Sequence, residues 1–279
     1  MVLSTETKSM ILKFVKEEPR TINDIAKLIG KSWLTANAYV ERIKEETGLL
    51  NTKTFRGGTR GALKIVYWNY VESLGNEDLK QELFDKIRLG LRKEDFDPLD
   101  IYLHVDANKK RVFAEHYTEV LVSKKQNLIG LFRSAEHEIL CFSGNLSWIN
   151  VVEGNNCILD VLEEVANQKI AIRIMGRVDI ASIKNINKII KINKKIGREA
   201  IEVRHRRQPL RGFIIDNKVA RLKEEKEKGK YEKGELEYNT RIFYEIYDEE
   251  WVSWLKKVFW ALYRYATPAE RRIKELEFI

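Results

Sequence analysis

A glycine-rich, basic tip between two runs of β-forming residues constrains the N-terminal part of this chain more than any other feature. The tip covers residues 56–61, with the sequence RGGTRG, and residues 49–55 and 62–70 on either side favour strands. This pattern predicts a β-hairpin with a tight, positively charged end. Glycine lets another backbone approach closely, so arginines beside glycines suit contact with a phosphate backbone.

Three helical patterns precede the hairpin. The first ends before Pro19, the second runs from Thr21 to Gly30, and the third covers about 32–46. Three helices closed by a basic hairpin resemble a winged helix-turn-helix domain of the prokaryotic transcription-regulator type. The resemblance covers about a quarter of the chain, and it implies that residues 1–70 bind nucleic acid.

The third helix and the hairpin supply the candidate nucleic-acid contacts. In a helix-turn-helix the third helix enters the major groove, where an asparagine can pair with adenine and an arginine with guanine or phosphate. With Ala36, Val40 and Ile43 facing inward, the outward residues of this helix are the candidates for base or phosphate contact. The expected binding residues are Lys31, Ser32, Thr35, Asn37, Tyr39 and Arg42 on the helix, and Lys53, Arg56, Arg60 and Lys64 on the hairpin. The alternative is that they form the ordinary surface of a domain used for protein contacts.

The charge balance agrees with an anionic partner. The 279 residues include 50 Lys and Arg against 42 Asp and Glu, which gives a net charge of +8. Residues 1–70 contain twelve basic and seven acidic residues, so most of the excess lies in this segment. DNA and RNA both carry phosphates, so the positive charge of the chain does not distinguish a DNA partner from an RNA partner. We expect duplex DNA as the first candidate partner and ribosomal or other structured RNA as the second.

The composition argues against several other classes of protein. The longest apolar runs, such as 62–68, are far shorter than the roughly 18 residues of a membrane span, and no secretory signal pattern is seen at the start. A cytoplasmic location is therefore expected. Cys141 and Cys157 lack a paired spacing, the four histidines lack metal-ligand spacing, and no nucleotide-binding glycine loop occurs, so neither a metal nor a cofactor is expected. Abundant Glu, Lys, Arg and Ile with few Gln favour a thermophilic archaeal or bacterial source.

Residues 71–134 are predicted to form a helical connector with a small hairpin. One helix is expected over 77–93, strands over 101–105 and 111–113, and a second helix over 115–132. The first helix carries an apolar stripe that a lone helix cannot bury by itself. We therefore expect a homodimer. The residues of the stripe are Leu79, Leu83, Ile87 and Leu91.

From residue 138 onward the pattern alternates between strands and helices, which is typical of an α/β domain. Strands are predicted over 139–142, 170–175, 201–204, 213–215, 219–222 and 241–247, with helices around 158–165 and over 183–196 and 249–265. The order resembles one half of the phospholipase D fold, and residues 209–216 (PLRGFIID) resemble the signature strand of that superfamily. The run of Lys and Glu over 223–237 is expected to be a solvated loop or hairpin tip.

The signature strand departs from the pattern of active enzymes. Aligned on Asp216, the resemblance places Pro209 where active members carry the nucleophilic histidine and Arg211 where they carry lysine. Proline offers no nucleophile, and His205 lies four residues earlier, too far to replace it without reshaping the strand. We therefore expect no catalytic residue and a turn role for Asp216. A phospholipase D-like nuclease with a repositioned His205 remains the enzymatic alternative.

Taken together, these segments resemble the TrmB-type archaeal regulators over nearly the whole chain. The expected fold combines α+β and α/β parts: a winged helix-turn-helix over 1–70, a helical connector over 71–134, and a phospholipase D-like α/β half-domain over 135–279 that dimerises. The resemblance implies a non-enzymatic, homodimeric transcription regulator that binds DNA. An RNA- or ribosome-associated factor using the same basic wing is the alternative.

Overall fold

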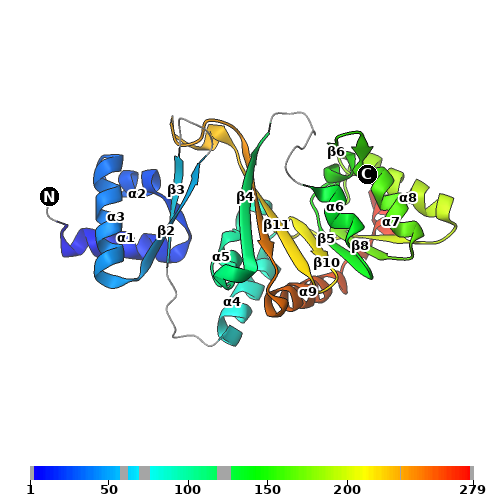
Figure 1. Ribbon diagram of the computed structural model, residues 1–279, viewed down its shortest axis with the longest axis horizontal. Coiled ribbons are helices and arrows are strands. Elements are labelled where there is room, and N and C mark those ends of the chain that lie inside the picture. The colour runs from blue at the N-terminus through cyan, green and yellow to red at the C-terminus, as the bar shows by residue number, and fades with distance from the viewer. Residues whose placement is uncertain (1–2, 57–61, 69–75, 118–126, 233, 277–279) are drawn as a thin grey trace. The chain divides into compact units, whose positions relative to one another are not determined.

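The structure, a computed structural model, describes residues 3–56, 62–117, 127–232 and 234–276 apart from 69–75, and it divides into two compact units (Figure 1). The first unit comprises Met1–Leu79 together with Lys226–Thr240. The second comprises Lys80–Glu225 and Arg241–Ile279. The first unit is therefore completed by a segment that the chain reaches only after most of the second unit.

The first unit has the winged helix-turn-helix arrangement predicted from the sequence. Its elements are α1 (Thr5–Glu17), β1 (Arg20–Thr21), α2 (Ile22–Ile29), α3 (Trp33–Thr47), β2 (Leu50–Arg56) and β3 (Ala62–Trp68). The three strands form one sheet with β3 in the middle. Helix α2 begins with a capping box between Thr21 and Asp24 and ends at Gly30, whose φ of +61° suits a residue without a side chain. Fully buried isoleucines and valines, including Ile25, Val40 and Val66, fill the core.

The second unit is built on an eight-stranded mixed sheet with the order β13-β9-β8-β5-β10-β11-β12-β4. Its strands are β4 (Lys110–His116), β5 (Glu138–Phe142), β8 (Ala171–Gly176), β9 (Ile201–His205), β10 (Gly212–Ile215), β11 (Val219–Lys226), β12 (Thr240–Ile246) and β13 (Thr267–Pro268). Strands β5, β8 and β9 are parallel, whereas β10 pairs antiparallel with β5 and β11. The alternation of strands and helices confirms the predicted α/β class. A small separate ladder joins β6 (Val152–Glu153) and β7 (Asn156–Cys157).

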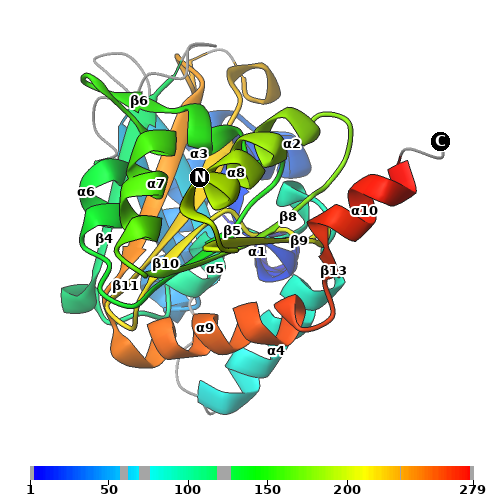
Figure 2. The same cartoon turned by 90° about the vertical axis from the view of Figure 1, so that its right-hand side faces the viewer.

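Helices cover both faces of this sheet (Figure 2). Successive side chains of a strand point to opposite faces, and β5 shows the consequence: Ile139 and Cys141 join the core formed with α6, α7 and α8, whereas the ring of Phe142 meets Phe259 of α9. On the α9 side, Lys80 of α4 pairs with Glu250. The helices are α4 (Asn76–Leu89), α5 (Leu99–Tyr102), α6 (Leu128–Arg133), α7 (Ile158–Asn167), α8 (Ile183–Ile196), α9 (Glu249–Tyr263) and α10 (Ala269–Leu276). Among the residues described, no helix is long and apolar enough to cross a membrane.

Residues 71–134 match the predicted connector only in part: the helix expected over 77–93 is α4, and the strand expected over 111–113 lies within β4. The hairpin is wrong, because Ile101 lies in α5 and is fully buried, and β4 is the edge strand of the large sheet. The helix predicted over 115–132 is wrong over its first residues, since β4 extends to His116 and α6 begins only at Leu128; residues 118–126 lie outside the described part of the chain.

The apolar stripe of α4 does not need a second chain to cover it. Leu79, Leu83 and Ile87 are all buried within the chain itself. Only Leu91, at 54% exposure, keeps a large exposed surface. The argument for a homodimer from this stripe is therefore wrong.

Candidate nucleic-acid interface

The first turn of α3 is open to solvent. Ser32 begins the helix, and its Oγ accepts the N–H of Thr35 at 3.3 Å and lies 3.0 Å from the Thr35 hydroxyl. Lys31 is exposed beside it, and Leu34 is 75% exposed. The start of α3 therefore presents a lysine, two hydroxyl groups and an exposed leucine to solvent.

Asn37 and Lys64 were predicted as separate contacts, and the structure brings them together. The Lys64 ammonium of β3 donates to Asn37 Oδ1 at 2.7 Å and to Glu41 Oε1 at 2.6 Å. This contact with Lys64 holds the pKa of the Glu41 carboxyl below its usual value, against the opposing effect of its burial. Lys64 therefore fixes the hairpin to α3. The amide nitrogen of Asn37 donates to no other described residue, so it remains available to a base.

Tyr39 is a correction to the predicted set. It is only 8% exposed and belongs to the core of the first unit. Its position explains the burial, because residues 36, 39 and 43 follow one another at spacings of three and four and so lie on one helix face. The helical period was thus a signal that could have placed Tyr39 with the core residues Ala36 and Ile43.

Arg42 lies on the exposed side of α3 in a chain of surface ion pairs. Its Nε donates to Glu46 Oε1 at 2.6 Å, and Lys8 of α1 donates to Glu46 Oε2 at 2.8 Å. These two hydrogen bonds lower the pKa of the Glu46 carboxyl. Exposed pairs of this kind are weak in water, so Arg42 can exchange Glu46 for a phosphate at little cost.

The hairpin register divides the predicted basic strip between two faces. Strands β2 and β3 pair from Leu50 opposite Trp68 to Arg56 opposite Ala62. Lys53 lies opposite Ile65, one position along the ladder from Lys64, so their side chains point to opposite faces. Strand alternation in the sequence could have shown this. Arg60 lies outside the described residues, and Arg56 is placed only as the last residue of β2.

The Lys and Glu run predicted over 223–237 as a solvated loop or hairpin tip begins in β11 and connects it to β12, its neighbour in the sheet, and from Lys226 onward it belongs to the first unit. Lys27 of α2 pairs with Glu232 at 2.7 Å, and this contact raises the pKa of the lysine. The Lys228 N–H donates to Asn239 Oδ1 at 2.8 Å, and Leu236 is buried. The segment that was predicted as solvated therefore has an ordered contact with α2.

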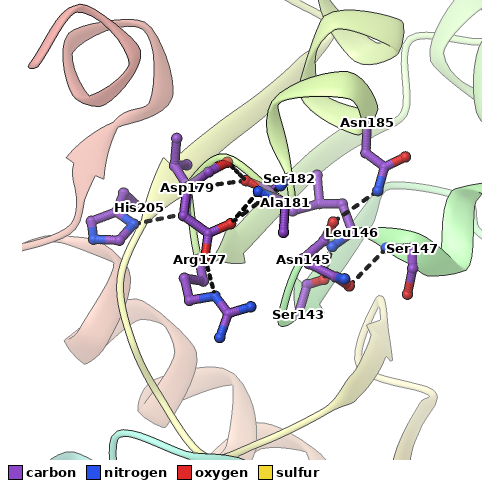
Figure 3. Close-up of polar contacts among 11 residues, drawn as sticks. Ser143, Asn145, Leu146, Ser147, Arg177, Asp179, Ala181, Ser182, Asn185 and His205 are labelled. Atoms are coloured by element: carbon purple, nitrogen blue, oxygen red, sulfur yellow. Dashed lines mark hydrogen bonds and ion pairs between the residues drawn. The ribbon is translucent and has the colours of Figure 1, made fainter. Parts of the chain in front are cut away.

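A second polar site lies where the three parallel strands end (Figure 3). Ser143 and Asn145 follow β5, Arg177 and Asp179 follow β8, and His205 ends β9. Carboxyl ends of parallel strands meet at one edge of a sheet, where α/β proteins commonly bind ligands. Here the groups largely satisfy one another. The Arg177 Nε contacts Asp179 Oδ2 at 2.6 Å, and Asn185 donates to the Asn145 carbonyl at 2.9 Å. In the described part of the chain, no group of three or more His, Cys, Asp or Glu could hold a metal ion.

The geometry of His205 does not suit a nucleophile. The Val178 N–H donates to His205 Nδ1 at 2.8 Å, so the neutral ring carries its proton on Nε2 and has no free lone pair. Burial, together with nearby Arg272 and Arg207, lowers the pKa of the ring. The Arg211 guanidinium is turned to backbone, donating to the carbonyls of Gln208 and Leu210 at 3.0 and 2.6 Å.

Asp216 lies at the other end of β10 and is the turn residue predicted from the sequence. Its φ is +52°, and its carboxylate accepts the N–H groups of residues 136, 137 and 138 at 3.0, 2.9 and 2.8 Å. These three donors fix the start of β5 against the turn between β10 and β11. Asp216 therefore has a structural role far from the polar edge that holds His205.

No protein-family model matches the chain, and no curated protein matches its sequence. Solved structures similar to the chain include TrmBL2, which is described as an archaeal chromatin protein with a novel mode of DNA binding. The two share 17% identity over 95% of this chain and 94% of TrmBL2, with a TM-score of 0.41. The phospholipase D family member Nuc from Salmonella typhimurium shares 12% identity over 57% of this chain and 98% of its own, with a TM-score of 0.39. NucT from Helicobacter pylori shares 12% identity over 57% of this chain and 99% of its own, with a TM-score of 0.38. Likenesses at this level identify no family for the chain.

Proposed function

We propose that this chain is a non-enzymatic protein that binds duplex DNA through its winged-helix unit and acts as a transcription regulator. The observation that carries the proposal is the open first turn of α3 beside the hairpin that Lys64 fixes to it. In this arrangement Lys31, Ser32 and Thr35 stand at the helix end that enters a major groove in helix-turn-helix proteins. The hairpin arginines add phosphate contacts, and the Asn37 amide nitrogen is the group that can read a base.

The proposal includes pairing of two chains, because a two-fold pair of winged helices can bind two half-sites of a palindromic sequence. The candidate contact in this chain is a pair of leucines: Leu89, the last residue of α4, is 72% exposed, and Leu91, just after the helix, is 54% exposed. In the proposed pair, these two leucines would be covered by the second chain. Light scattering should give twice the chain mass of 32.8 kDa. A monomer at every concentration would remove the dimer from the proposal and leave DNA binding untouched.

The DNA-binding test compares the hairpin with the recognition helix. Fluorescence anisotropy with duplex DNA and with structured RNA should be measured for Arg56→Ala/Arg60→Ala and for Asn37→Ala. The double variant should weaken binding to all duplex sequences and lower the slope of log affinity against log salt by roughly 0.9 per lost contact. Asn37→Ala should cost about 1 to 3 kcal/mol on a preferred site and little on random DNA.

A matched control removes two exposed basic residues from the second unit, as in Lys257→Ala/Lys274→Ala. This control should bind as the wild type does. If the hairpin variant loses binding to ribosomal subunits or structured RNA while Asn37→Ala changes nothing on any duplex, the regulator proposal is overturned. The RNA- or ribosome-associated alternative then replaces it.

A further inference from the structure

Helix α8 of the second unit carries a concentration of positive charge that the winged helix does not account for. Between Asp179 and Glu199 the sequence has five lysines and one arginine, and no acidic residue. These residues are Lys184, Lys188, Lys191, Lys194, Lys195 and Arg198, and all six are exposed.

The basic residues of α8 share one face. At 3.6 residues per turn, they fall within an arc of about 120°, which extends roughly 16 Å along the helix from Lys184 to Lys195. The opposite face is apolar, and Ile186, Ile189 and Ile192 are buried in the core with α7 and the sheet. Packing of the isoleucines therefore fixes which side of the helix presents the lysines to solvent.

Little of this charge is neutralised within the chain. Lys195 contacts Glu163 of α7, and Lys188 donates to the uncharged Asn150 Oδ1 at 2.5 Å. Within the described parts of the chain, Lys184, Lys191 and Lys194 have no carboxylate partner. Other exposed helices mix the two signs, as α4 does with Lys86 and Glu82. A surface that serves only solubility mixes signs in this way, so the single sign on α8 points to a ligand of opposite charge.

The packing of α8 also decides what kind of anionic partner fits. A basic amphipathic helix can bind a membrane surface by burying its apolar face among the lipids. In α8 that face is already used by the core, so only the lysine side is available. An exposed row of lysines about 16 Å long suits the phosphate backbone of a duplex, which has one negative charge per about 1.7 Å of axis.

We propose that the basic face of α8 is a second DNA-binding surface that contacts the phosphate backbone without reading bases. This inference rests on the proposed function, because it adds a contact to the same ligand. The winged helix then supplies sequence preference, while α8 supplies affinity that depends on salt and is indifferent to sequence. Lys184, Lys188 and Lys191 form the centre of this surface, since Lys195 is shared with Glu163.

The test uses the full chain and a variant matched in charge. Lys184→Gln/Lys188→Gln/Lys191→Gln removes three exposed lysines from α8, and Lys218→Gln/Lys257→Gln/Lys274→Gln removes three exposed lysines elsewhere in the second unit. Binding to a long duplex of random sequence is measured over a range of salt concentrations. The α8 variant should lower the slope of log affinity against log salt by roughly 0.9 per lost contact, or about 2.7 for three. The control should keep the wild-type slope.

The possible outcomes separate this inference from the proposed function. If Arg56→Ala/Arg60→Ala weakens binding but the α8 variant has the slope of its control, the second surface is overturned and the winged-helix proposal stands. If the wild type does not bind duplex DNA, the proposed function fails first. Vesicles containing phosphatidylserine provide a last check: loss of vesicle binding in the α8 variant with unchanged DNA binding would assign the lysines to a membrane surface and overturn the inference.

Discussion

Replacing Asp216 with alanine should lower the free energy of unfolding of the second unit by about 3 to 5 kcal/mol. The carboxylate accepts three backbone N–H groups at 2.8 to 3.0 Å, and it is only 5% exposed, so water cannot readily replace it. A hydrogen bond to a charged group contributes about 1.5 to 3 kcal/mol, and bonds that share one acceptor add less than their sum. Alanine would also have to adopt the positive φ of this turn.

Urea unfolding followed by tryptophan fluorescence is a suitable assay, because Trp148, Trp251, Trp254 and Trp260 lie in the second unit. The matched control is Lys218→Ala, two residues away, whose ammonium is exposed and pairs with exposed Glu136 at 2.5 Å. This control should change stability by less than about 0.5 kcal/mol. A cost within about 1 kcal/mol of wild type for Asp216→Ala would refute the structural role assigned to the carboxylate.

The same site predicts a dependence on pH. Burial of Asp216 disfavours its charge, but the three N–H donors prevail and hold the pKa of the carboxyl below its usual value. A group whose pKa is lower in the folded state stabilises the fold above its unfolded pKa, and this contribution is lost as pH falls through the folded pKa. Asp216→Asn should therefore flatten the acid side of the stability curve, whereas an acid limb as steep as that of the wild type would argue against the N–H contacts.

Three further predictions concern single residues of the second unit. Gly212→Ala should prevent stable folding, because a Cβ there would lie 2.2 Å from the Arg221 carbonyl oxygen; a soluble variant with wild-type unfolding by circular dichroism would contradict this. Burial opposes the charge of Glu225, but nearby Lys223 prevails and lowers the pKa of Glu225 to about 2. The wild type should therefore lose stability as the pH falls from about 4 toward 2, and Glu225→Gln should reduce this loss. No phosphodiesterase activity should be detected with a chromogenic diester, with or without divalent metal, because the lone pair of His205 Nδ1 is occupied; metal-independent activity that His205→Ala abolishes would show the opposite.

Elements with strong local signals were predictable from the sequence. Helix α8 was placed over 183–196 because its isoleucines recur at helical spacing, and α2 was placed by Thr21 and Gly30, which determine its two ends. Strands β1 and β13 have two residues each and show no periodicity. The sequence predicts part of β4, over 111–113, but the place of this strand at the sheet edge depends on pairing that local residues do not encode.

The candidate site was predictable in outline but not in its pairings. Serine at the start of α3 and lysines on the hairpin are visible in the sequence, because caps and basic turns are local features. The link from Lys64 to Asn37 joins residues 27 positions apart, and it exists only because β3 packs beside α3. The hydrogen bond from the Val178 N–H to His205 Nδ1 is also invisible in the sequence, because it depends on how the ends of two parallel strands meet.

Residues Lys226–Thr240 belong to the first unit, and this limits how the protein can be divided into fragments. A fragment that stops near residue 79 would keep the three helices and the hairpin, yet it would lose Leu236 from its interior and the partner of Lys27 on α2. The winged-helix unit is thus discontinuous in sequence, and no single cut in the chain releases it whole. Transfer of this unit to another protein would therefore require both of its stretches, Met1–Leu79 and Lys226–Thr240, together.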